Sequence, residues 1–196
     1  MIINPRRALP LLLLCMTVLA SCAHVPRGPK EQGYLYPAPD AGKGNRSVGS
    51  EAIFENDSVR MAIRQMRKDE PAGVFIAGLL DRDYVIFRLS IENRGAEKII
   101  YNPSYTVLTN GSLDYRKPLD FTDLYDIAGG TEKLRALRGR FYDVNVTVAP
   151  GTRTSRMLIF RPFSEGAQDA ELAIKEIYIG TGTERMAFRF VMKAVE

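Results

Sequence analysis

Few side chains in this chain are suited to catalysis. The 196 residues include a single histidine, His24, and two cysteines, Cys15 and Cys22. Histidine is the usual general base near neutral pH, and histidine and cysteine are the usual zinc ligands. The glycine-rich run 180–183 lies between two predicted strands instead of before a helix, so we interpret it as a turn and not as a phosphate-binding loop. We therefore expect no enzymatic activity and no cofactor.

Three aspartates at a spacing of three residues are the strongest remaining candidates for chemistry. Asp120, Asp123 and Asp126 would share one face of a helix. Carboxylate oxygens of this kind bind calcium, and paired carboxylates, here Asp120 with Asp123 or Asp143, carry out glycoside hydrolysis. No calcium-loop pattern accompanies them, so a solvated acidic face or ion pairs with nearby arginines are the simpler predictions.

These aspartates belong to the segment 118–142, which is too long for a hairpin loop and which we predict forms one or two short helices. Its first part is acidic and its second part, after Gly129-Gly130, is basic. Because insertions into β scaffolds commonly carry function, we expect this one to be a separable graft that forms a binding face. Its tentative binding residues are Asp120, Asp123, Tyr125, Asp126, Arg135 and Arg138.

The amino terminus has the features of a secretory signal. Arg6 and Arg7 precede an apolar run of about ten residues, which is too short to span a bilayer. The run ends in Leu19-Ala20-Ser21-Cys22, which resembles the lipobox of bacterial lipoproteins. The resemblance implies that residues 1–21 are removed as a signal peptide, that the Cys22 sulfur is acylated, and that the protein is held in the lipid bilayer.

The residue after the lipidated cysteine implies a destination. In lipoproteins of Gram-negative bacteria, an Asp at that position usually causes retention in the inner membrane, whereas this chain has Ala23. The resemblance therefore implies an outer-membrane lipoprotein, with another bacterial cell membrane as the alternative.

Charge distribution argues against nucleic-acid binding. The chain has a formal net charge of +4, but the excess lies in the signal peptide and in residues 23–50. Residues 51–196 contain equal numbers of basic and acidic side chains, so they lack the basic surface that binding to phosphates requires.

Residues 22–50 have the composition of a tether. They are rich in proline and glycine and have almost no aliphatic periodicity, so we predict a lipidated linker with a reach of roughly 85 Å when extended. The folded domain is expected over residues 51–196.

The pattern of apolar residues in this domain has a period of two. Alternation over 59–64 and 85–91 predicts half-buried strands, and further strands are expected over 144–149, 153–160, 172–179 and 184–192. Asn110-Gly111 predicts a hairpin with a type I′ turn. The apolar segment 73–80 is interpreted as a buried strand or loop, with an exposed binding patch as the alternative. The fold class is thus mainly β, an antiparallel immunoglobulin-like β-sandwich with a short helical insertion.

Two further stretches resemble the telokin-like immunoglobulin modules of bacterial surface lipoproteins. They are 83–93, an apolar strand ending in Asn93, and the Pro150-Gly151 turn that leads to the strand ending in Phe160. The resemblance implies a module that binds or scaffolds, with an envelope protein as its partner. The alternative is a module that binds a small ligand or polysaccharide through Tyr115, Tyr125, Phe141 and Tyr142.

Overall fold

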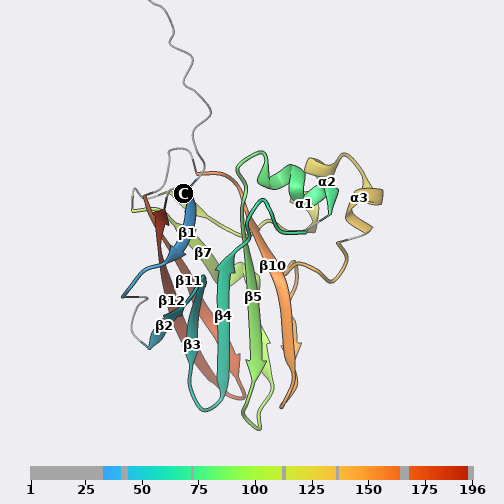
Figure 1. The fold of residues 1–196 in the computed structure, drawn as a ribbon. Helices are drawn as coiled ribbons and strands as arrows, with labels where there is room; N and C mark the ends of the chain where they lie inside the picture. Colours follow the sequence, from blue (N-terminus) through green and yellow to red (C-terminus); the bar gives the residue numbers. More distant parts are fainter. Residues whose placement is uncertain are drawn as a thin grey trace, which may run out of the picture. The chain divides into compact units, whose positions relative to one another are not determined.

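The structure is a computed structural model that describes residues 33–40, 44–71, 73–111, 114–135, 137–163 and 168–193. Its strands form two antiparallel sheets (Figure 1). The first sheet has the strand order β1-β12-β11-β6-β9, with β7 also pairing with β11 and β8 with β7. The second has the order β10-β5-β4-β3-β2. The molecule is therefore an antiparallel β-sandwich, compatible with the immunoglobulin-like class, and the predicted fold class is confirmed.

The strands of the first sheet are β1 (Tyr34–Pro37), β6 (Ile99–Tyr101), β7 (Thr106–Thr109), β8 (Tyr115–Arg116), β9 (Val146–Val148), β11 (Asp169–Ile179) and β12 (Gly182–Lys193). Those of the second are β2 (Asn45–Val48), β3 (Glu51–Glu55), β4 (Val59–Gln65), β5 (Val85–Asn93) and β10 (Arg153–Phe160). The helices are α1 (Val74–Leu80), η1 (Pro103–Tyr105), α2 (Phe121–Ala128) and α3 (Thr131–Arg135). None of the helices in the described part of the chain is long and apolar enough to cross a membrane.

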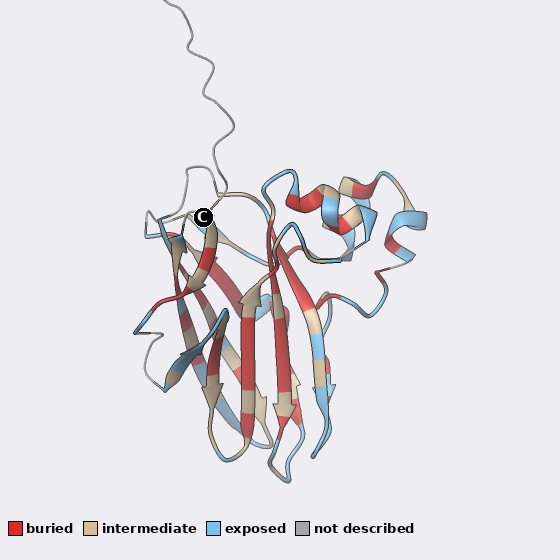
Figure 2. Ribbon diagram, in the orientation of Figure 1, coloured by how far each residue is buried: buried red, intermediate tan, exposed pale blue. Residues whose placement is uncertain are grey.

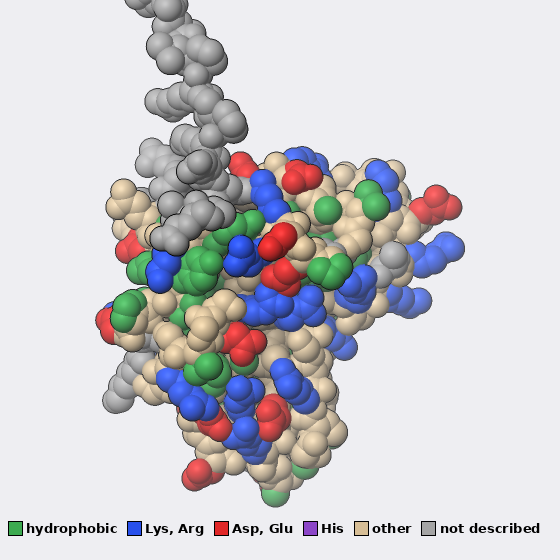
Figure 3. All heavy atoms as spheres, in the orientation of Figure 1, with side chains coloured by type: hydrophobic (Ala, Val, Ile, Leu, Met, Phe, Trp, Pro, Cys, Tyr) green, Lys and Arg blue, Asp and Glu red, His purple; other side chains and the backbone are tan. Residues whose placement is uncertain are grey.

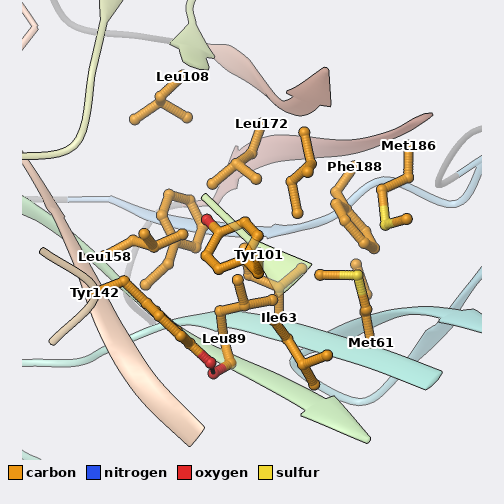
Figure 4. Close-up of a cluster of buried hydrophobic side chains, with 14 of the residues drawn as sticks. Met61, Ile63, Leu89, Tyr101, Leu108, Tyr142, Leu158, Leu172, Met186 and Phe188 are labelled. Atoms are coloured by element: carbon orange, nitrogen blue, oxygen red, sulfur yellow. Dashed lines mark hydrogen bonds between the residues drawn. The ribbon is translucent and has the colours of Figure 1, made fainter. Parts of the chain in front are cut away.

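The main core fills the space between the two sheets. In Figure 4, Met61, Ile63 and Leu89 of the second sheet lie opposite Leu172 and Phe188 of the first. This arrangement confirms the predicted alternation, because every second side chain of β4 and β5 points into the core.

Two tyrosines extend the core toward its edge. The rings of Tyr101 and Tyr142 meet edge to face at 5.0 Å, and the Tyr142 hydroxyl donates to the Leu89 carbonyl at 3.3 Å. Burial raises the pKa of both hydroxyls, so both remain neutral at physiological pH. Tyr142 is the last residue of the segment predicted as a graft, so that segment contributes to the sandwich core.

A second cluster lies on the outer face of β5 and β10. The outward-facing Ile86, Met157 and Ile159 are buried there under α1, α2 and α3. Figure 2 shows the result along β10, whose first half is largely exposed and whose second half is buried. The predicted helical insertion is confirmed. The prediction that it is a separable graft is not, since the insertion covers apolar residues of two strands.

The predicted type I′ turn at Asn110-Gly111 is wrong. β7 pairs with β8 through Thr109 and Tyr115, so more than two residues separate the paired strands, and neither Asn110 nor Gly111 has the positive φ that a type I′ turn requires. Asn110 is instead buried, at 4% exposure. The two-residue hairpin lies between β11 and β12, where Gly180 adopts a φ of 59°.

The folded domain also begins earlier than residue 51. β1 pairs with β12 and β2 pairs with β3, which places two strands within the segment predicted as tether. Leu35 of β1 is buried in the main core. β1 lies at the edge of its sheet, where Pro37 costs little because an edge strand need not donate from every residue. Cys22 and residues 1–32 lie outside the described residues.

Candidate functional site

Two segments that the sequence singled out separately meet in one place. The segment 73–80 was predicted to be a buried strand or loop, but it forms the helix α1. Its buried face, formed by Ile76, Leu79 and Leu80, packs in the same cluster as Leu124 of α2 and Leu134 of α3. We call this part of the molecule, α1 with α2 and α3, the helical end.

Local sequence explains where α1 begins and ends. Gly73 precedes it with a φ of 82°, which a residue with a side chain rarely adopts. After Leu80 the chain reverses at Asp83, whose φ is 64°. Arg82 is held close to the helix, because its Nε donates to the Gly78 carbonyl at 3.0 Å and its guanidinium lies 5.6 Å from the centre of the Tyr84 ring.

The aspartates of α2 serve the helix itself. Asp120 is the N-cap, accepting from the Asp123 backbone at 2.9 Å, and the Asp123 carboxylate accepts from the Asp120 backbone at 3.3 Å. This reciprocal arrangement is a capping box. Asp123 also pairs with Arg161 at 2.8 Å. Of the two predicted alternatives, a solvated acidic face or ion pairs with the nearby Arg135 and Arg138, the second is wrong for Asp123, because its partner Arg161 directly follows β10.

A groove of about 560 Å³ separates α1 from α2 and α3. Its apolar lining includes Phe75 of α1, Ile127 of α2 and Leu137. A Cβ atom added at Gly73 or Gly78, which also line it, would have no heavy atom within 4 Å. Both glycines therefore leave this part of the groove open.

All the charged side chains among the described residues that line the groove are basic. They are Arg82, Lys133 and Arg140, which come from the end of α1, from α3 and from the residues after α3. With apolar side chains between them, they suit a ligand that has both negative charge and apolar surface.

A second depression of about 440 Å³ lies beside α3. Arg135 and Arg138 line it together with Phe121, Phe141 and Asp143. The structure thus brings two of the six predicted binding residues into one hollow. Asp120 and Asp123 form the helix cap, while Tyr125, at 43% exposure, and Asp126 are exposed on α2.

Basic side chains over β3, β4 and β5 are accompanied by acidic ones. Figure 3 shows Lys and Arg interleaved with Asp and Glu over β3, β4 and β5. Arg94 contacts both Glu55 and Glu92, and its hydrogen bonds hold the pKa of both carboxyls below the usual value. The groove differs because basic residues alone carry its charge.

The comparisons with known proteins add only general information. No family model matches the chain, and no curated protein matches it. Among solved structures, the Bacillus subtilis protein yjhA is similar over 63% of this chain and 76% of its own, with 18% identity and a TM-score of 0.40. The B. subtilis protein ycdA, proposed to be a lipoprotein, is similar over 71% of this chain and 38% of its own, with 12% identity and a TM-score of 0.43.

The predicted aromatic platform is not formed, because Phe141 and Tyr142 are buried while Tyr115 and Tyr125 are exposed on different elements. Within the described ranges, no group of three His, Cys, Asp or Glu side chains could hold a metal ion. Arg82 was missed by sequence analysis. Phe75 and Arg140 lie in the segments 73–80 and 118–142, which the sequence offered as separate binding faces, and the three residues gather only when α1 folds against α2 and α3.

Proposed function

We propose that this chain is a lipid-anchored lipoprotein of the cell envelope whose β-sandwich is a non-enzymatic binding module. The lipobox at Leu19 to Cys22 supports the anchor, and Ala23 supports the outer membrane as the destination. The groove of the helical end is the binding face. The observation that carries this proposal is that the groove combines an apolar lining with three basic side chains and, among its described residues, no acidic one.

The chemistry of the groove indicates the kind of partner. An acidic segment of a protein would place carboxylates near Arg82, Lys133 and Arg140, while apolar side chains of that segment cover Phe75 and Ile127. Buried apolar area contributes about 25 cal/mol per Å², and each partly exposed charge pair adds up to about 1 kcal/mol. Apolar contact and the three basic residues thus both contribute to the affinity, and the basic residues also supply selectivity.

A small anionic ligand is the second candidate. The groove volume of about 560 Å³ lies within the range of about 300–1,000 Å³ that is typical of small-molecule sites. A cross-linker in the groove would capture a protein in the first case and no protein in the second.

Site-specific photo-cross-linking in cells tests the proposed function. The probe replaces Val74, which lines the groove and is 93% exposed. We expect a protein adduct that is lost when Lys133→Glu and Arg140→Glu are combined. The control is Lys175→Glu, an exposed charge reversal on β11. An adduct that survives the double reversal, or that is equally sensitive to the control, contradicts the proposal.

A further inference from the structure

The first described strand is fixed at the end of the sandwich that carries the groove. The Leu35 amide donates to Oε1 of Gln65, the last residue of β4, at 2.6 Å. The Lys68 amide donates to the Tyr34 hydroxyl at 3.0 Å, and the Arg67 guanidinium lies 5.3 Å from the centre of that ring. The start of β1 is thus joined to the connection that leads from β4 into α1.

The groove lies at the same end of the sandwich as the start of β1. Only residues 66–73 separate β4 from α1, and Figure 1 shows the start of β1 and the three α-helices at the same end of the sandwich. The hairpin of β11 and β12 lies at the opposite end. Because β12 has 12 residues, that opposite end is about 40 Å away at about 3.4 Å per residue.

Covalent geometry then limits how far the start of β1 can lie from the lipid. Cys22 and Tyr34 are 12 positions apart, and a chain of that length spans at most about 40 Å. This is about half the reach of roughly 85 Å that composition alone predicts for a tether over 22–50. The limit applies to the start of β1, which lies at the end of the sandwich that carries the groove.

We infer that the groove binds an acidic segment of a protein located at the surface of the same membrane. This inference rests on the proposed function and on acylation of Cys22. Three basic side chains provide the charge complementarity, and the short connection to β1 provides the location.

The test changes only the length of the segment between Cys22 and Tyr34. A Gly/Ser insert of 24 residues between Gly28 and Pro29 triples the separation of Cys22 from Tyr34 and leaves the described residues unchanged. Effective concentration at the membrane surface falls roughly as the −3/2 power of linker length, so the yield of the Val74 adduct should fall about fivefold. The Cys22→Ser variant, which lacks the lipid, should give a lower yield still.

The outcomes separate the two proposals. An adduct yield that is unchanged or higher with the long connection overturns the membrane-surface location and leaves the groove as a binding face. An adduct with lipid in place of protein overturns the inference in favour of direct contact with the bilayer. If neither connection gives an adduct, the proposed function fails and this inference fails with it.

Discussion

Arg64 and Glu70 form a two-point ion pair that fixes the connection between the sandwich and the groove. The two terminal nitrogens of Arg64 lie 2.5 and 2.8 Å from the two carboxylate oxygens of Glu70. One of these oxygens also accepts from the Arg67 backbone at 3.0 Å. Since residue 64 belongs to β4 and residue 70 lies just before α1, this pair sets the path of the chain into the groove.

Acidification should weaken this ion pair and loosen the segment between β4 and α1. The hydrogen bonds from Arg64 hold the pKa of Glu70 below its usual value. A lowered folded-state pKa means that the stabilisation is fully present above the unfolded value of about 4.3 and is lost as the pH falls through the lowered value. The protection of residues 66–80 from hydrogen exchange, relative to the intrinsic rate at each pH, should therefore fall below about pH 4.

The Glu70→Gln variant should remove most of this pH dependence and destabilise the connection by about 1 kcal/mol, a value reduced for partial exposure. The Asp69→Asn variant is the matched control, because Asp69 is 72% exposed. If Glu70→Gln retains the same acid-dependent exchange as the unaltered protein, another carboxyl controls this segment.

Deleting residues 118–142 should prevent cooperative folding. The deletion uncovers Ile86, Met157 and Ile159 and removes Tyr142 from the main core. Loss of one large buried aromatic side chain costs about 3–5 kcal/mol, while a whole domain is stable by only about 5–15 kcal/mol. Urea unfolding followed by circular dichroism measures the effect.

A shorter deletion separates the covering of the outer face by the helices from the contribution of Tyr142 to the main core. Replacing residues 121–135 with a Gly/Ser linker keeps Tyr142, so the sandwich should still form but bind a hydrophobic dye through its uncovered outer face. Cooperative unfolding of the 118–142 deletion at unchanged stability would show that the insertion is a graft after all.

Strands bounded by clear turn residues could be predicted from the sequence. The predicted strand 153–160 has the bounds of β10, because the Pro150-Gly151 turn leads into it and its apolar run ends at Phe160. β1 was missed because its four residues include Pro37 and follow a proline-rich stretch. Its pairing with β12 joins residues more than 150 positions apart, and no local pattern reports such a contact.

The groove could be predicted only in parts. The apolar segment 73–80 and the charged segment 118–142 each stood out, but neither alone indicates a site. Arg82, Lys133 and Arg140 come from different elements and converge only through packing of the second apolar cluster. The aspartates were the more conspicuous pattern, yet Asp120 and Asp123 serve mainly to cap α2.

The Cys22→Ser variant should leave the protein without its lipid. Serine cannot form the thioether, so metabolic labelling with palmitate should give no signal, and the protein should appear in the soluble fraction or remain uncleaved. The His24→Ala variant is a suitable control, because it changes a neighbouring residue without removing the thiol. Palmitate incorporated into Cys22→Ser would disprove the lipobox assignment.

Two substitutions at Gly78 test the central claim most directly, because they change the groove and little else. Gly78 is an interior residue of α1 that faces open space. Gly78→Ala should stabilise the helix by about 0.5–1 kcal/mol and leave the groove usable, whereas Gly78→Phe fills the groove. The measurement is the yield of the Val74 protein adduct in cells, with folding of each variant checked by urea unfolding. We predict that Gly78→Ala retains the adduct and that a folded Gly78→Phe variant loses it; an undiminished adduct with folded Gly78→Phe would contradict the assignment of the groove as the binding face.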